Sequence, residues 1–211
     1  MQRGMQCAAL DKVYDGQPDC LTPDGLHRWV DELCFLDKSG LAWFGTQCSS
    51  FVLLCKKQSA RNPSNAWIGD ESCQFVKDGN KLMHITAMLY LVAHMNGCNC
   101  VLEQPGSSVL PRLQPLSTVL TWTQAAKTST WHGSFGGDSP KPLQLWHTHP
   151  EYRLLSRKRP LGMQGLTTRK PKEDGSIAYT GKLKALKASQ CYGVEFSRAV
   201  AGITQTLAVH G

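Results

Sequence analysis

Two residues with reactive side chains, Cys48 and Glu103, each lie at the end of a short apolar run. A buried parallel strand delivers side chains in this way to the carboxyl edge of an α/β sheet, where open sheets place their chemistry. Cys48 is therefore a candidate nucleophile, and Ser49 and Ser50 after it can donate hydrogen bonds. A packing role competes, because free cysteine is among the most buried residue types and the chain has nine. For Glu103 the alternative is a helix N-cap or a loop salt bridge.

Two aspartates near the N-terminus suit ligand binding at the same sheet edge. Asp11 lies in the apolar run of residues 5–14, which predicts a strand, and Asp19 follows a Gly-Gln-Pro turn that predicts a shorter strand exit. A carboxylate at a strand exit can make two hydrogen bonds to a diol. Capping of a turn is the structural alternative for both aspartates.

The elements that must position these residues follow from local patterns. Thr22 and Pro23 predict a helix start, with apolar residues at helical spacing after them, and Gly40 precedes a predicted strand over residues 41–44. Residues 56–78 are polar and predict a loop with one short helix, or a flap over a site. Residues 79–95 predict a helix that buries one apolar face. We expect that face to contain Leu82, Ile85, Met88, Leu89, Val92 and Met95.

The chain is basic, with a net charge of +7. Its 211 residues are enough for one domain with a full core. Ten lysines and arginines lie between residues 153 and 187, against one glutamate and one aspartate. Such a cluster favours a polyanionic partner, although a solvated basic loop is also common. No secretory signal is visible, and residues 82–95 are too short to span a bilayer. The cysteines therefore suit reduced thiols, and no pair has the spacing of a structural zinc site.

The order of these motifs resembles the DNA (cytosine-5) methyltransferases, most closely their short phage-type and algal relatives. The turn around Cys48 resembles the family's Pro-Cys loop, and residues 101–105 resemble the strand that ends in its catalytic glutamate. Residues 133–136 with 141–146 resemble the family's Tyr-Gly…Lys-Pro-Thr strand. Residues 189–196 resemble the start of its last helix.

The resemblance implies covalent catalysis on a flipped cytosine. The thiolate of Cys48 would add to carbon 6, and Glu103 would stabilise the charge that develops at the ring nitrogen. The target nucleotide must first leave the base stack, at a cost of a few kcal/mol that backbone contacts offset. The residues implied to contact double-stranded DNA are Ser49, Ser50, Arg61, Lys141, Arg157, Lys158 and Arg159.

The implied cofactor is S-adenosylmethionine. Asp11 would bind its ribose hydroxyls and Asp19 its adenine amine, while Gln47 stands in place of the family's proline before the cysteine. The family's glycine-rich first motif has no counterpart in the sequence. Because that turn supplies backbone donors for the cofactor, we expect binding to be weak or lost, as in a fragment of an active enzyme.

Together these features predict an α/β, Rossmann-like methyltransferase sheet with helices on both faces and a small basic insertion. Residues 1–147 and 188–211 would form the catalytic core, and residues 148–187 a small recognition segment. We expect an intracellular monomer, nuclear if eukaryotic and otherwise cytoplasmic, with no membrane partner. The alternative functions are a catalytically silent nucleic-acid-binding protein on the same scaffold, or an enzyme acting on another polynucleotide.

Overall fold

The computed structural model describes residues 6–11, 16–173, 177–181 and 191–210. A four-stranded sheet in the order β1-β2-β4-β3 lies at its centre, with β1 and β2 parallel and β4 antiparallel to both of its neighbours. The fold is therefore mixed α/β. The strands are β1 (Leu41–Phe44), β2 (Asn99–Pro105), β3 (Ala126–Trp131), β4 (Pro142–His147), β5 (Thr167–Pro171) and β6 (Ile177–Gly181). The helices are α1 (Pro23–Cys34), η1 (Leu53–Cys55), α2 (Lys56–Ser59), η2 (Pro63–Asn65), α3 (Gln74–Met95), η3 (Leu110–Arg112), α4 (Leu116–Trp122), η4 (His132–Phe135), η5 (Pro150–Leu155) and α6 (Val194–His210).

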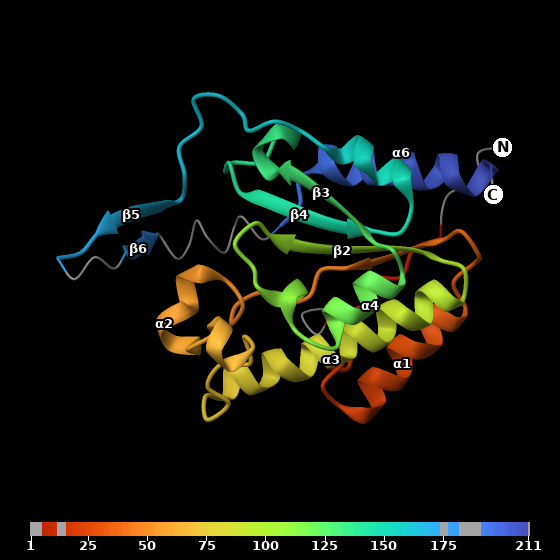
Figure 1. The fold of residues 1–211 in the computed structure, drawn as a ribbon. Coiled ribbons are helices and arrows are strands. Elements are labelled where there is room, and N and C mark those ends of the chain that lie inside the picture. Colours follow the sequence, from red (N-terminus) through yellow and green to blue (C-terminus); the bar gives the residue numbers. More distant parts are fainter. Residues whose placement is uncertain (1–5, 12–15, 174–176, 182–190, 211) are drawn as a thin grey trace.

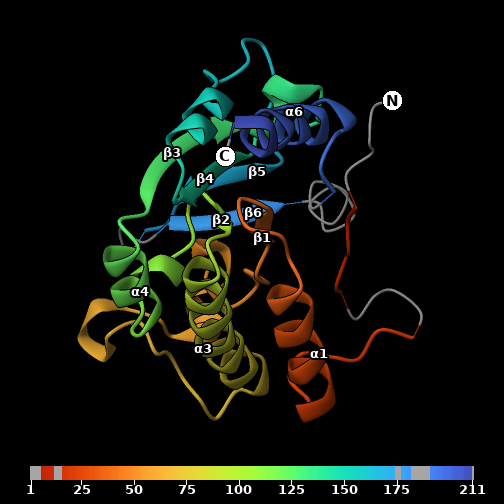
Figure 2. The same ribbon diagram turned by 90° about the vertical axis from the view of Figure 1, so that its right-hand side faces the viewer.

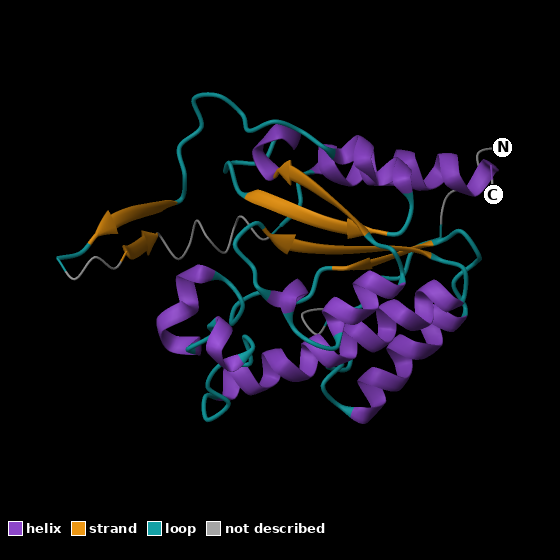
Figure 3. Ribbon diagram, in the orientation of Figure 1, coloured by secondary structure: helices purple, strands orange, loops and turns teal. Residues whose placement is uncertain are grey.

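Helices cover both faces of the sheet and make three layers. Figure 1 shows α6 on one face and α1, α3 and α4 on the other, and the turned view of Figure 2 shows the same separation. The colouring by secondary structure in Figure 3 sets the strands as a thin layer between the two sets of helices. Each face of the sheet therefore has its own core.

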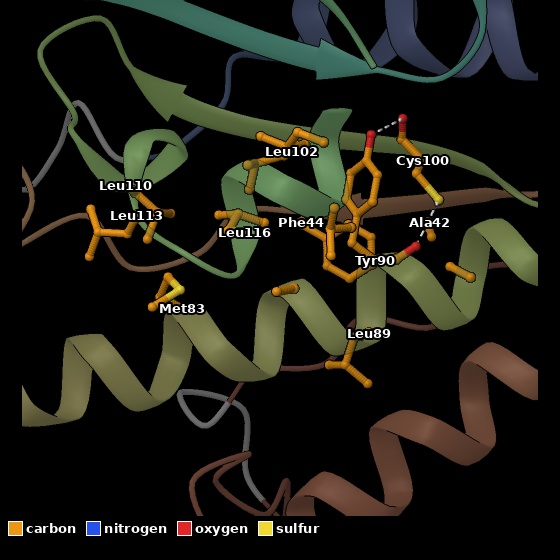
Figure 4. Packing of buried hydrophobic residues seen from close by; sticks show 14 of the residues in the cluster. Ala42, Phe44, Met83, Leu89, Tyr90, Cys100, Leu102, Leu110, Leu113 and Leu116 are labelled. Atoms are coloured by element: carbon orange, nitrogen blue, oxygen red, sulfur yellow. Dashed lines mark hydrogen bonds between the residues drawn. The ribbon is translucent and has the colours of Figure 1, made fainter. Parts of the chain in front are cut away.

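The core between the sheet and α3 is built by alternate residues of β1 and β2. Phe44 and Leu102 face this side, and Tyr90 on α3 packs against Phe44 with ring centroids 5.4 Å apart. Figure 4 shows Tyr90 reaching across the cluster, where its hydroxyl donates to the carbonyl oxygen of Cys100 at 3.5 Å. Burying these side chains removes apolar surface from water at about 25 cal/mol per Å².

The helix predicted over residues 79–95 exists, but its buried face differs from the prediction. Met88 and Met95 are 40% and 76% exposed, whereas Met83 and Tyr90 are fully buried. The buried residues still recur at helical spacing, because the sheet contacts the side of α3 that bears Met83, Ala87 and Tyr90. Of the six predicted residues, Leu89 is buried, Leu82, Ile85 and Val92 are half-buried, and the two methionines are exposed.

The core on the opposite face is smaller and aromatic. Val101, Leu145 and Phe196 are buried here together with Tyr152 of η5, and Trp43 packs against them. Because successive side chains of a strand point to opposite faces, Glu103 shares this face with Val101. The alternation of β2 thus directs Glu103 toward the α6 layer.

The N-terminal segment differs from the predicted strand. Residues 6–11 form no strand, and Asp11 is exposed there, while residues 5 and 12–14 of that prediction lie outside the described residues. Residues 19–22 form a turn rather than a second strand exit, since Asp19 Oδ1 accepts from the backbone N–H of Leu21 at 3.0 Å. The predicted helix start is confirmed, because Thr22 Oγ1 accepts from the N–H of Gly25 and Pro23 occupies the first turn.

The segment predicted as a recognition insertion, residues 148–187, divides into two parts. Its first part, η5, belongs to the core, because Tyr152 and Leu155 are buried there. The antiparallel hairpin of β5 and β6 instead projects from the body, beyond the edge of the sheet toward which β1 and β2 point (Figure 1).

A buried arginine organises the loop between β1 and α3. The guanidinium of Arg61 donates to Ser50 O at 2.9 Å, to Trp67 O at 2.6 Å and to Ile68 O at 2.8 Å. It also lies over the Phe51 ring, 4.1 Å from the centroid. Burial lowers the pKa of Arg61 to about 10, so the side chain remains charged at neutral pH. Arg61 therefore joins the loop's distant turns through their carbonyl groups.

Replacing Arg61 with methionine should destabilise the protein, because several buried carbonyl groups would lose their donors. We expect the free energy of unfolding in urea to fall by about 3 kcal/mol or more. The control is Arg112→Met, whose guanidinium lies over the half-buried Trp67 ring but whose side chain is exposed. That change should cost about 1 kcal/mol or less. Equal losses in the two variants would contradict the role given to Arg61.

Candidate functional site

The candidate site lies at one edge of the sheet, where four elements meet. β1 and β2 pair in parallel from Leu41↔Asn99 to Phe44↔Leu102, so both strands end at this edge. β3 also ends here and β4 begins here, because β4 is antiparallel to β2 and to β3. The pairing therefore brings the Cys48 loop and Glu103 to the same edge, as the sequence predicted. It adds two residues to them, His132 after β3 and Lys141 before β4.

Glu103 is a buried carboxyl group with one oxygen engaged. It is 6% exposed, and its Oε2 accepts a hydrogen bond from the Tyr192 hydroxyl at 2.8 Å. Its Oε1 is enclosed and has no hydrogen-bond partner within the part of the chain that the structure describes. Burial raises the pKa of Glu103, and Lys141, the Tyr192 hydrogen bond and His132 oppose that rise. The pKa of the Glu103 carboxyl group therefore lies above that of an exposed glutamate.

Cys48 is half-buried in the loop after β1, within electrostatic range of Glu103 and Lys141. Burial raises the pKa of the Cys48 thiol; the positive charge of Lys141 lowers it, and the carboxylate of Glu103 raises it further. In the protein alone the thiol is therefore the favoured form, contrary to the depressed pKa expected of a nucleophile. Lys141 is the residue that shifts both groups toward their charged forms.

Tyr192 and Trp43 also belong to the site, although the sequence did not predict them there and residues 189–196 indicated only the start of a helix. The two rings meet edge to face with centroids 6.1 Å apart, and Tyr192 also lies 5.2 Å from the Phe196 ring. His132 Nε2 lies 2.9 Å from the Cys191 carbonyl oxygen and so donates to it. These contacts fix the segment before α6 against the sheet edge. No local pattern could indicate them, since Tyr192 and Glu103 are distant in sequence.

A buried glutamine next to Glu103 holds the Cys48 loop in place. Gln104 is fully buried, and its Nε2 donates to the Thr46 carbonyl oxygen at 2.7 Å. Its Oε1 accepts from the Ser108 hydroxyl at 2.8 Å. The Thr46 hydroxyl in turn lies 2.7 Å from that of Thr86 on α3. Adjacent residues of β2 thus serve the two faces: Gln104 supports the loop and Glu103 faces the α6 layer.

Two of the residues expected at DNA are structural instead. Arg61 is buried and its donors are used by the loop carbonyls, so it cannot reach a phosphate. Ser50 is 1% exposed, and its hydroxyl accepts from Arg61 Nη2 at 3.0 Å. Both predictions are therefore corrected. Ser49 is exposed beside the Cys48 loop, and Lys141 is half-buried at the sheet edge.

The residues expected to bind S-adenosylmethionine do not form one cradle. Asp11 lies in a segment without a strand, and Asp19 caps the turn before α1 through Oδ1. Gln47 is exposed next to Cys48. Neither aspartate thus lies at a strand exit from which it could bind a ribose diol, and the fit of these residues to this cofactor is poor.

The basic run Arg157–Arg159 is exposed and anchored beside the same sheet edge. The Ser134 hydroxyl on η4 donates to the Lys158 carbonyl oxygen at 2.6 Å. Arg157 lies over the Phe135 ring and Arg159 over the Trp131 ring, at 5.4 Å and 5.6 Å from the centroids. A shallow groove of about 460 Å³ runs between this run and α6 and is lined by both Arg157 and Arg198. The run therefore presents positive charge near the turn that follows β3.

Comparison with protein families, with curated proteins and with solved structures finds no match to this chain. Among the helices of the described residues, none combines the length and the apolar character needed to cross a membrane.

The reactivity of Cys48 should depend on Lys141 and Glu103 in opposite directions. Because the thiolate is the reactive form, Lys141→Ala should slow alkylation of Cys48 by iodoacetamide at pH 8, by roughly threefold to tenfold. Glu103→Gln should accelerate it by a similar factor. Rates are measured by mass spectrometry of the Cys48 peptide. Lys127→Ala is the control, since Lys127 is exposed over Trp146. If neither variant changes the alkylation rate, Lys141 and Glu103 do not control the ionisation of the Cys48 thiol.

Proposed function

We propose that this chain adds the Cys48 thiolate to carbon 6 of a cytosine in DNA, as the step that prepares carbon 5 for methylation. The observation that carries the proposal is the placement of Cys48 and Glu103 at one edge, in the loop after β1 and in the neighbouring parallel strand β2, with Lys141 acting on both. A nucleophile and a buried acid at the carboxyl edge of a sheet are the groups that this addition requires. The motifs that resemble DNA (cytosine-5) methyltransferases agree with it.

Each of the three residues has a role that its surroundings support. Glu103 has a raised pKa and an unengaged Oε1, which suits a protonated carboxyl group that donates to a ring nitrogen. Lys141 favours the thiolate of Cys48 over the thiol. When carbon 6 gains the sulfur, the negative charge that develops on the ring is stabilised by the proton on Glu103. Carbon 5 thereby becomes an enamine carbon that can accept an electrophile.

The basic run and the projecting hairpin are placed to hold the DNA backbone. Arg157, Lys158 and Arg159 lie beside the turn after β3, and exposed Lys170 and Lys172 extend along the hairpin side. Phosphate contacts of this kind offset the cost of flipping the base. The aromatic rings beneath Arg157 and Arg159 limit the freedom of those side chains before binding.

S-adenosylmethionine would supply the methyl group when bound. The described residues make a poor cradle for it, so we propose that this chain binds the cofactor weakly and that addition to cytosine proceeds in its absence. Proton exchange at carbon 5 then reports the addition without any methyl donor. The enamine takes a proton from water at carbon 5; the original hydrogen is then lost to water as a proton, which restores the 5,6 double bond and expels the thiolate.

A second candidate is a catalytically silent DNA-binding protein on the same scaffold. The raised pKa of Cys48 favours it, because burial makes the thiol inert. The two candidates share the basic run and differ only in whether Cys48 reacts. DNA binding without exchange at carbon 5 would favour the silent protein.

DNA that carries tritium at carbon 5 of cytosine should release it slowly in the presence of this protein. We expect Cys48→Ala and Cys48→Ser to abolish the release, and Glu103→Gln to reduce its rate by roughly 10² or more. Cys55→Ser is the matched control, because Cys55 is a half-buried cysteine close to Cys48 and should retain full activity. Release that persists in Cys48→Ala, or that never exceeds the rate in buffer, would reject the proposed chemistry.

Affinity for duplex DNA should fall steeply as salt rises. The slope of log K against log salt should become shallower by about one unit for each of Arg157→Ala, Lys158→Ala and Arg159→Ala that removes a phosphate contact. Arg28→Ala is the control, since Arg28 is exposed on α1, across the sheet from the basic run. Fluorescence anisotropy with a labelled duplex measures both quantities. A slope that stays the same in all three variants would leave the run a solvated surface.

A further inference from the structure

Tyr192 is linked to Glu103, which is distant in sequence, by a single hydrogen bond. Its hydroxyl donates to Glu103 Oε2 at 2.8 Å although 89 positions separate the two residues. Tyr192 exposes 38% of its surface, but the hydroxyl end lies against the buried carboxyl group. The tyrosine therefore joins the segment before α6 to the acid of the site.

Several contacts fix the ring, so the hydroxyl has little freedom. Trp43 meets it edge to face, and Phe196 packs against it on the α6 side. The backbone before the ring is held where His132 donates to the Cys191 carbonyl oxygen. The ring of His132 is itself covered by Gly137, where a Cβ atom would lie 1.9 Å from Nδ1, so this close approach requires glycine.

The same hydroxyl lies beside the loop that carries the candidate nucleophile. A Cβ atom on Gly45 would be 3.5 Å from the Tyr192 hydroxyl oxygen, which places that oxygen against the backbone between β1 and Cys48. The carboxylate of Glu103 and the thiol of Cys48 both act on the ionisation of Tyr192, whose pKa burial raises well above its usual value. Tyr192 thus stays protonated and remains a donor.

We propose that Tyr192 is a positioning residue: it holds the Glu103 carboxyl group through Oε2 and so fixes the orientation of Oε1, the oxygen left for a substrate that displaces the atoms enclosing it. The geometry supports this directly, since Oε2 is engaged at 2.8 Å and Oε1 has no partner among the described residues. The role of Oε1 toward a substrate rests on the proposed function, whereas the fixing of the carboxyl group by Tyr192 does not.

The other charged groups near the carboxyl group come from each neighbouring element. Lys141 precedes β4, His132 begins η4 and Cys48 follows β1, and all three lie within electrostatic range of Glu103 or of the Tyr192 hydroxyl. On α6, Glu195 and Arg198 pair with each other at 2.7 Å near the surface. Tyr192 is the side chain for which the structure shows a hydrogen bond to the carboxyl group.

The test compares Tyr192→Phe with Tyr152→Phe. Tyr152 is a fully buried tyrosine of the same layer, and its hydroxyl lies 3.3 Å from that of Thr204, away from Glu103. The carboxyl signals of the six glutamates are followed by carbon-13 NMR as pH changes, and Glu103 is assigned by the signal missing in Glu103→Gln. Because the lost bond favoured the carboxylate, the Glu103 midpoint should move to a pH higher by roughly 0.5 or more in Tyr192→Phe. Tyr152→Phe should leave it in place.

A double-mutant cycle in urea gives a second measurement that uses no substrate. The unfolding free energies of Tyr192→Phe, Glu103→Gln and the double variant should show coupling, whereas Tyr152→Phe with Glu103→Gln should be additive. An unmoved Glu103 midpoint, or zero coupling, would overturn the proposal. Neither measurement depends on tritium release, so an inactive protein with a shifted midpoint would reject the proposed chemistry and leave the positioning role intact. If the protein is active, the pH profile of tritium release should shift in Tyr192→Phe in the same direction as the midpoint.

Discussion

The parallel pairing of β1 with β2 is the constraint on which the rest of the site depends. β1 is a short strand at the edge of the sheet, and its register with β2 fixes where the following loop begins. Gln104 then holds that loop from within β2 through the Thr46 carbonyl group. A slip of β2 by one residue against both β1 and β4 would move Glu103 to the α3 face and Gln104 to the α6 face, because side chains alternate along a strand. The support of the loop and the acid of the site would be lost together.

Burial at this edge sets the chemical states of the two reactive groups in the same direction. Desolvation favours the neutral forms of both Cys48 and Glu103, and Lys141 opposes it at both. A neutral Glu103 suits an acid, while a neutral Cys48 suits a packing residue, so one environment supports the role of one residue and hinders that of the other. A base bound between them would exclude water further and bring its own polar atoms. The balance between the proposed enzyme and a silent scaffold therefore depends on how strongly Lys141 acts on the thiol.

Arginine has two opposite uses in this fold. Arg61 is buried and joins the turns of the loop between β1 and α3 through their carbonyl groups, which gives a long polar segment a fixed shape. Arg157 and Arg159 are exposed and lie over aromatic rings beside the sheet edge, where positive charge faces solvent. The same side chain thus supports the framework in one place and a positively charged surface in the other. Burial decides which, and neighbouring sequence gives little sign of it.

The sequence by itself determined the elements whose signals are local. Thr22 and Pro23 mark the start of α1, and the apolar runs that lead to Cys48 and Glu103 form β1 and β2, because capping and strand propensity act between near neighbours. Only the tertiary structure decided which face of α3 is buried, that Arg61 is internal, and that residues 6–11 form no strand. It alone joined Tyr192 to Glu103. These outcomes depend on contacts between segments far apart in the chain, and a short window of sequence carries no record of which segments will meet.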